Sequence, residues 1–461
     1  MITRRTLSTL IGSALTTGLS THSFAQNTWI KSRDDASDIL RGYQSEYLRV
    51  PKIYAAPKTE MELTQALDFI RAKNRQFAFQ SSGHCFAGFS QSKDVLIDMR
   101  GFNRIEIKDD LITFGPGVRV QDLNRALTPL GLILPLGTCP TVAMGGYVSA
   151  GGVGAWSRAL GLASDAVISF RIALSDGRIV NASETSNADL YWALRGGVAS
   201  GFGALISITS RAVPFSEARL LTFLASGNAK DMGRWLAGLE TLLTSADQRL
   251  DLAFGLASHS DDSFVITLDL TSLADFETTR DFAVEIFNLG HMVGDPKIVE
   301  GDLSTIAPAL HPAGYETTRR IHNSIYTQRR LNAQEWESFL HEMGQAHRAV
   351  APLVLYRALG GAVEEGQSGA YAHRAAKALI SISARPKVNS EAKSAYPSLH
   401  RLRNKLVEFG ATGMYPAYPD RYFENWATEN WGSNYARLQK VKAKYDPTDF
   451  FHTPQSVRLP A

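Results

Sequence analysis

The sequence predicts an α+β fold of two domains, and three observations carry this prediction. The chain has 461 residues, of which 44% are hydrophobic, and this is more than one domain's worth of core. Helical and strand patterns alternate through the region 45–215, which is typical of an α/β domain. Through 216–409, long strand patterns are interleaved with amphipathic helices, which indicates an antiparallel sheet with helices on one face.

Each element of the first region has its own signal. The segment 57–74 places apolar residues at helical spacing, and Thr59 stands where a helix cap is needed. Asp176-Gly177 predicts the turn of a hairpin. The remaining elements are predicted as strands at 76–82, 94–107 (with a turn), 111–120 and 203–214, a helix at 120–135 that ends near Gly131, the hairpin over 166–183, and a short helix at 187–197.

The second region and the tail are assigned in the same way. Helices are predicted at 231–245 and 333–346, and strands at 250–258, 263–272, 353–363 and 378–385. The last segment, 410–461, contains a helix followed by a Pro-rich end within 431–457.

The N-terminus predicts an export signal over residues 1–25. Arg4 and Arg5 precede a mildly apolar run, and Ser23 and Ala25 offer the small residues that a signal peptidase reads. Paired arginines before a weak apolar core favour a twin-arginine signal, and so a periplasmic or secreted protein; a plain secretory signal and an unexported amphipathic segment stay open. The net charge of +3 does not suggest a nucleic-acid partner, and no apolar stretch in the body is long enough to predict a membrane span.

The chain has only two cysteines, Cys85 and Cys139, and they allow two interpretations. In an exported protein they could form a disulfide, which would stabilise the fold by roughly 3–4 kcal/mol through chain entropy. Alternatively, each thiol could have a separate role.

Two glycine-rich segments could hold a ligand. The first, "QSSGHCFAGFS" at 80–90, follows a strand, and such a turn can aim backbone N–H groups at an anion. The second, at 136–161, contains five glycines between Gly145 and Gly154 and would let the backbone approach a ligand closely. Its spacing lacks the third glycine of a dinucleotide fingerprint, since Ser157 stands there. Taken singly, a surface turn and a tightly packed corner stay open.

Together, these segments resemble the cofactor-anchoring segments of the FAD-linked oxidases of the vanillyl-alcohol oxidase superfamily, in the berberine-bridge-enzyme-like branch that includes oligosaccharide oxidases. "QSSGHCFAG" and "GTCPTVAMGGYVSAGGVG" match the first two motifs of that family, and "WALRGGVASGFG" matches the third. The end, "WGSNYARLQKVKAKYDPTDFFHTPQSV", is similar to the closing motif. The resemblance implies a PCMH-type FAD-binding domain of two α/β subdomains over 45–215, a substrate domain over 216–409, and a C-terminal segment that returns to the FAD domain.

The resemblance also implies how the cofactor is held. FAD would be attached by two covalent bonds, one from the His84 imidazole to the flavin 8α-methyl carbon and one from the Cys139 sulfur to flavin C6. Cys85 would then remain a sequestered free thiol. A single link through the histidine is the alternative. No metal is predicted. The remaining cofactor-binding residues implied are Ser81, Ser82, Gly83, Cys85, Gly88, Thr138, Thr141, Val142, Gly145, Gly146, Gly151, Gly152, Ile206 and Asn434.

The implied reaction is the oxidation of an alcohol. In the sugar-oxidising branch a tyrosinate acts as the base, and "MYPAYPD" places Tyr418 at that position; a packed loop aromatic is the alternative. Since a free tyrosine has a pKa of about 10, nearby positive charge or hydrogen bonds must lower it, and Arg357 is a possible helper. Tyr326, Tyr356 and Arg357 are predicted to face the flavin from the substrate domain.

The resemblance leaves the electron acceptor and the substrate open. Val142 stands at the family's oxygen-gate position, and this favours an oxidase that reduces O2 to hydrogen peroxide. The alternatives are a dehydrogenase that uses a quinone or cytochrome, and a non-catalytic flavin- or sugar-binding module. The expected substrate is a bulky alcohol, either an oligosaccharide or a hydroxylated aromatic natural product, and the expected state is a monomer or weak dimer.

Overall fold

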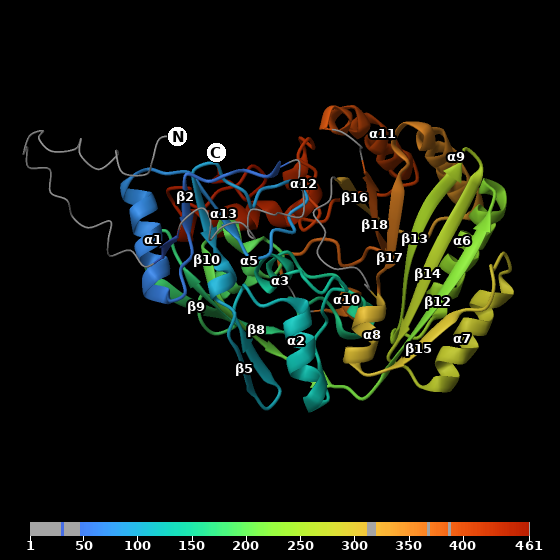
Figure 1. The fold of residues 1–461 in the computed structure, drawn as a ribbon, viewed down its shortest axis with the longest axis horizontal. Helices are drawn as coiled ribbons and strands as arrows, with labels where there is room; N and C mark the ends of the chain where they lie inside the picture. Colours follow the sequence, from blue (N-terminus) through green and yellow to red (C-terminus); the bar gives the residue numbers. More distant parts are fainter. Residues whose placement is uncertain (1–28, 32–46, 311–319, 367–368, 386–388, 461) are drawn as a thin grey trace, which may run out of the picture.

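In the computed structural model, the described residues are 29–31, 47–310, 320–366, 369–385 and 389–460. They form two lobes that face each other (Figure 1). The predicted export signal lies outside the described residues. No described helix is both long and apolar enough to cross a bilayer.

The first lobe contains two sheets. The four-stranded sheet has the order β1-β2-β4-β3, and β4 is parallel to both β2 and β3. Its strands are β1 (Ile30–Lys31), β2 (Ile53–Ala55), β3 (Phe77–Gln80) and β4 (Val95–Asp98). Helix α1 (Glu60–Ala72) makes the crossover from β2 to β3, and Thr59 caps it by accepting a hydrogen bond from the Glu62 N–H, as predicted.

The second sheet of this lobe is antiparallel throughout. Its order is β5-β6-β10-β8-β9, formed by β5 (Ile105–Lys108), β6 (Leu111–Phe114), β8 (Val167–Ala173), β9 (Ile179–Ser183) and β10 (Ala204–Arg211). A separate pair joins β7 (Leu132–Ile133) to β11 (Val213–Pro214). The hairpin β8–β9 turns at Asp176-Gly177, where Gly177 has a φ of 87° that favours glycine. The helices of this lobe are α2 (Val120–Leu127), α3 (Met144–Ser149), α4 (Ser157–Leu160) and α5 (Ala188–Leu194).

The second lobe is one antiparallel sheet covered by helices on its outer face (Figure 1). The strand order is β15-β12-β14-β13-β17-β18-β16. The strands are β12 (Ala218–Gly227), β13 (Leu250–Ser260), β14 (Ser263–Ser272), β15 (Lys297–Gly301), β16 (Ile321–Thr327), β17 (Leu353–Ala358) and β18 (Ala378–Ala384). The helices are α6 (Ala229–Ser245), α7 (Phe276–Asn288), α8 (Leu303–Leu310), α9 (Ala333–Val350), α10 (Ala362–Glu365) and α11 (Asn389–Glu408).

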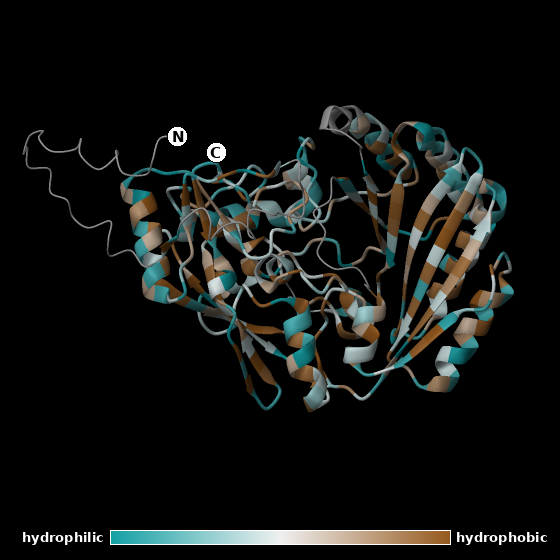
Figure 2. Ribbon diagram, in the orientation of Figure 1, coloured by the Kyte–Doolittle hydropathy of each residue, from teal (hydrophilic) through white to brown (hydrophobic). Residues whose placement is uncertain are grey.

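Alternation along these strands separates an apolar face from a more polar one. Leu221, Phe223, Phe254 and Tyr356 belong to the apolar core beneath the outer helices. Their neighbours on the strands point to the other face, toward the first lobe. The brown and pale bands along the strands in Figure 2 follow this alternation.

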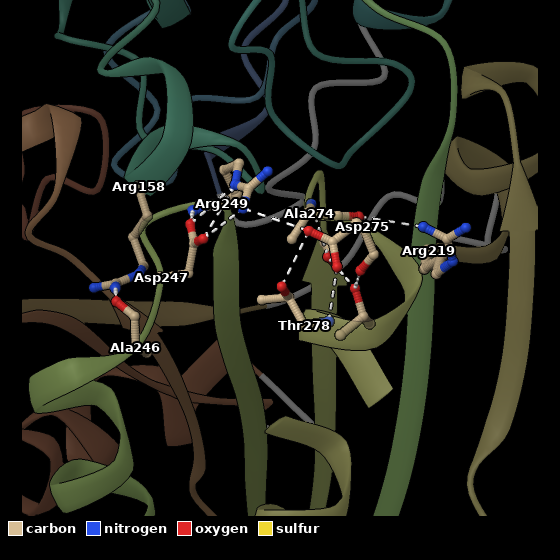
Figure 3. Close-up of polar contacts among 10 residues, drawn as sticks. Arg158, Arg219, Ala246, Asp247, Arg249, Ala274, Asp275 and Thr278 are labelled. Carbon is tan, nitrogen blue, oxygen red and sulfur yellow. Dashed lines mark hydrogen bonds and ion pairs between the residues drawn. The ribbon is translucent and has the colours of Figure 1, made fainter. Parts of the chain in front are cut away.

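Arg158 of α4 joins the two lobes. Its buried guanidinium donates hydrogen bonds to the carbonyl oxygens of Leu250 (2.8 Å), Leu359 (2.8 Å) and Ala246 (3.5 Å), and burial lowers its pKa. Figure 3 shows the Ala246 contact beside the exposed Asp247–Arg249 pair. Because one side chain of the first lobe donates hydrogen bonds to three carbonyl oxygens of the second, it fixes the orientation of the two lobes relative to each other.

The C-terminal segment packs back into the first lobe. Helices α12 (Trp426–Trp431) and α13 (Tyr435–Tyr445) place Trp431, Leu438 and Tyr445 in the apolar core that contains Phe170 and Leu190. Lys442 is fully buried there, and its ammonium donates to Asp446 (2.6 Å), the Gly201 carbonyl (2.8 Å) and the Phe451 carbonyl (2.6 Å).

We predict that Lys442→Ala lowers the free energy of unfolding by about 3–5 kcal/mol, because it leaves the buried Asp446 carboxylate without its cationic partner. Denaturant unfolding followed by fluorescence measures the change. Lys440→Ala, at an exposed position of the same helix, is the control and should change stability by less than about 0.5 kcal/mol. Equal effects of the two substitutions would contradict the role assigned to Lys442.

Candidate active site

A cavity of about 430 Å³ lies between the two lobes. Its first wall comes from the first lobe, through the loop after β3, the segment that leads into α3, and the turn at 198–205. Its second wall comes from the sheet of the second lobe. The C-terminal segment closes the cavity with residues of 415–419 and 452–456. Three separate parts of the chain therefore meet around one space.

The loop after β3 and the segment before α3 meet at Thr141. The Thr141 hydroxyl lies 2.9 Å from the His84 Nε2, although the two residues are 57 positions apart, and 3.5 Å from the Cys139 sulfur. A second link joins the same segments, since the Ser82 Oγ accepts a hydrogen bond from the Ala143 N–H at 2.9 Å. His84 and Cys139 thus stand on one wall of the cavity around a shared hydroxyl.

Neither cysteine is in a disulfide, and both lie within the described residues. Cys85 lines the cavity, and burial raises the pKa of its thiol although backbone N–H groups of 87–90 act in the opposite direction. Within the structure, a disulfide is therefore not what holds these loops together.

Glycine is required at a close contact between the segments of the first wall. A Cβ at Gly145 would stand 2.8 Å from the Pro116 Cβ and 3.3 Å from the Ser81 Oγ, whereas a Cβ at Gly146 would meet nothing within 4 Å. Gly83 has a φ of 76°, which turns the chain between Ser82 and His84. Around these glycines the backbone of both segments is exposed to the cavity.

Twelve of the residues proposed from sequence line the cavity. They are Ser81, Ser82, Gly83, His84, Cys85, Thr138, Cys139, Val142, Gly145, Gly146, Arg357 and Tyr418. Thr141 stands behind the wall and orders two of its members.

The other proposed cofactor residues do not line it. Gly88 packs against Tyr47, and Gly151 and Gly152 have positive φ and pack against Tyr371 and Ala163 respectively. Ile206 is in the core beneath the first sheet, and Asn434 donates to the Ala370 carbonyl at 3.3 Å. These positions support the wall from behind.

Two of the three residues proposed to face the flavin from the substrate domain do not. Tyr356 is in the apolar core, with its ring stacked on Phe254 at 4.5 Å. Tyr326 is fully buried and accepts a hydrogen bond from the Tyr371 hydroxyl at 2.9 Å. The prediction was wrong for Tyr356 because consecutive strand residues point to opposite faces, and on β17 it is Leu355 and Arg357 that face the cavity. It was wrong for Tyr326 because His373 stacks on that ring, with the ring centroids 4.4 Å apart.

Tyr415 and Tyr418 form an aromatic pair at the cavity. Their ring centroids are 5.0 Å apart, but their roles differ. The Tyr415 hydroxyl accepts hydrogen bonds from the N–H groups of Gly152 (3.2 Å) and Val153 (3.1 Å), and burial raises its pKa. Tyr415 is therefore a neutral anchor, whereas Tyr418 is half-buried and has its side chain at the cavity.

One ring from the His84 loop and one from β16 pack near Tyr418. The Phe86 ring is 5.2 Å from that of Tyr418 and stacks on His322 at 3.9 Å, and the His322 ring is 5.5 Å from Tyr418. Burial, together with Arg320, lowers the pKa of His322 well below its usual value, so this imidazole is neutral. His322 and Arg320 could not be identified from the sequence, because nothing in a single strand marks the face that a side chain will occupy.

The cavity has the features expected of a flavin site. Three polar atoms of its lining are buried without a hydrogen-bond partner among the described residues, namely Ser90 Oγ, Asn430 Oδ1 and Gln455 Oε1. Such atoms are costly unless a ligand satisfies them. Together with the glycine-lined wall, they show that the cavity is built for a large polar and aromatic ligand.

The fold and the cavity suit an FAD-linked oxidoreductase of two domains, and comparisons with known proteins identify two family domains within the chain. Residues 51–183 match the FAD binding domain family, and residues 414–458 match the "Berberine and berberine like" family. The chain therefore carries an FAD-binding domain and a berberine-like C-terminal region, and it is an FAD-dependent oxidoreductase.

Full-length relatives agree with this assignment. The chain is 25% identical over 440 residues to a chitooligosaccharide oxidase of Gibberella zeae, covering 88% of this chain and 87% of the relative. It is 27% identical over 456 residues to a carbohydrate oxidase of Microdochium nivale, covering 89% and 88%. The solved structure of Physcomitrella patens BBE-like 1 shares the fold, with a TM-score of 0.83 at 21% identity, over 93% of this chain and 96% of that chain.

Proposed function

We propose that this enzyme oxidises an alcohol group of a bulky substrate with covalently held FAD and passes the electrons to O2. The observation that carries the proposal is the meeting of His84 and Cys139 at Thr141 on one cavity wall, with Tyr418 lining the same cavity. When bound, FAD accepts a hydride from the alcohol carbon. The relatives named as oligosaccharide and carbohydrate oxidases support this class of reaction.

His84 and Cys139 are proposed as two covalent attachment points. An imidazole nitrogen and a thiolate are the nucleophiles that such links require, and both line the cavity. The Thr141 hydroxyl is placed to orient both groups. Two links would hold the cofactor in a cavity that stays open to a large substrate.

Tyr418 is proposed as the base that takes the alcohol proton. It is the half-buried member of the tyrosine pair, and its partner Tyr415 already accepts two backbone hydrogen bonds. The pKa of the neighbouring Tyr147 shows that Arg357 acts in this space. Burial raises that pKa, Tyr415 and Tyr418 raise it further, and the positive charge of Arg357 lowers it. Its guanidinium supplies the positive charge that stabilises a tyrosinate.

We predict that acid precipitation leaves a yellow pellet, because covalent bonds survive unfolding. Mass spectrometry should find the flavin mass on peptides that contain His84 and Cys139. His84→Ala and Cys139→Ala should each retain one link, and the double variant should release all flavin into the supernatant. Cys85→Ala is the matched control and should keep both links; a colourless wild-type pellet would contradict covalent attachment.

We predict that Tyr418→Phe lowers kcat by about 10²–10⁴-fold, the contribution typical of a positioned base, while flavin content stays unchanged. Hydrogen peroxide formation with a panel of sugar and aromatic alcohols measures kcat, and the acid limb of its pH profile should disappear. Tyr435→Phe, outside the cavity, is the control. Wild-type flavin that is reduced anaerobically but reoxidised slowly by O2 would instead favour a dehydrogenase, despite Val142 on the cavity wall.

We further propose that residues 1–25 direct export by the twin-arginine route, on the basis of Arg4 and Arg5 alone. Replacing both arginines with lysine in the full chain should leave the protein in the cytoplasmic fraction of a bacterial host. Processed protein in the periplasm from this variant would exclude the route.

A further inference from the structure

We infer that the natural substrate carries an anionic group, most simply a carboxylate, and that Arg357 binds it. This inference rests on the proposed function, since it assumes that an alcohol is oxidised in this cavity. It concerns the charge of the substrate, which the proposed reaction leaves open.

The first observation is the charge of the cavity lining. Arg320 and Arg357 line the cavity together with His84 and His452, whereas no aspartate, glutamate or lysine of the described residues does. Both arginines belong to the second lobe. Arg357 lies on β17, and Arg320 directly precedes β16. A neutral alcohol has no need for such an excess of positive charge, and an anion would be attracted by it.

The second observation is the geometry of Arg357. Its Nη1 donates to the Gly154 carbonyl (3.2 Å) and to Asp251 Oδ1 (3.1 Å), and this fixes one corner of the guanidinium. Its Nε and Nη2 donate to none of the described residues, and its side chain is 20% exposed. An anchored guanidinium with an open edge is suited to two parallel hydrogen bonds with a carboxylate.

The third observation is that Asp251 compensates Arg357 only in part. Asp251 is buried, and its Oδ2 has no partner among the described residues. Burial raises the pKa of Asp251 to about 7, even though Arg357 and Arg158 oppose this. Asp251 is therefore partly protonated near neutral pH, and two arginines surround it, so net positive charge remains on this wall.

The position of Arg357 connects the anion to the reaction. Leu355 and Arg357 alternate along β17 into the cavity that Tyr418 also lines. A substrate held by its carboxylate at Arg357 would present a neighbouring alcohol within the same space as Tyr418 and the flavin-attaching wall. Arg357 would then act in substrate binding as well as in stabilising the tyrosinate.

The test uses paired substrates of which one member carries a carboxylate that the other lacks, namely 4-(hydroxymethyl)benzoate against 4-(hydroxymethyl)benzamide, and glucuronate against glucose. We expect wild-type holoenzyme to show a kcat/KM at least tenfold higher for the anionic member of the better-oxidised pair, and a smaller ratio at high salt. Arg357→Gln should bring the ratio close to one, mainly through KM for the anion. Asp251→Asn should raise the ratio, because it removes the compensating carboxylate. Arg249→Gln, at the exposed pair of Figure 3, should leave the ratio unchanged.

A binding measurement keeps the test decisive if Arg357→Gln does not fold. Benzoate and benzamide are titrated into wild-type holoenzyme while the flavin absorbance is followed, and we expect benzoate to bind at least tenfold more tightly. Equal binding, equal kcat/KM within both pairs, or an unchanged ratio in Arg357→Gln that keeps its flavin would overturn the inference. Loss of flavin from Arg357→Gln, with equal binding of benzoate and benzamide to wild type, would overturn it too and would assign Arg357 to the cofactor. Failure of the proposed function has a different signature, since then no alcohol, neutral or charged, reduces the flavin under anaerobic conditions.

Discussion

The active site depends on the meeting of two loops at the Thr141 hydroxyl. His84 follows a strand of the parallel sheet, and Cys139 precedes the short helix α3, yet both lie within contact of one side chain. The Ser82–Ala143 hydrogen bond holds the same two segments together, and Gly145 lies close to Ser81 across them as well as to Pro116. A larger residue at Gly145 would separate the segments, and with them the two nucleophiles proposed to hold the flavin.

The other walls are set by buried charges that reach across the fold. Arg158 donates to three carbonyls of the second lobe. Lys442 ties the C-terminal segment to the first lobe through the Gly201 carbonyl, while its bonds to Asp446 and the Phe451 carbonyl lie within that segment. Buried charges are costly, so their partners must be satisfied together. The sheet that carries Arg357 and the segment that carries Tyr418 are thereby held against the wall of His84.

The fold class and the local part of the site could be predicted from sequence, whereas the choice of faces could not. Thr59, Asp176-Gly177 and the glycines of the first wall act within a few residues, and so their signals are local. Tyr356 and Arg357 are neighbours with opposite environments, and only the packing of α6 and α9 decides which one is covered. Arg320 and His322 were missed for the same reason, since their role appears only when β16 meets the His84 loop.

The Arg357–Asp251 pair shows how stability and function can be separated on one wall. A buried ion pair contributes little stability over an apolar pair of similar size, so stability alone gives little reason for these residues to be here. Burial also works against the Asp251 carboxylate, which weakens the pair as a structural element. A guanidinium that is held at one corner and open along its edge is, by contrast, what recognition of a planar anion requires. The charge on this wall is therefore best explained by what enters the cavity.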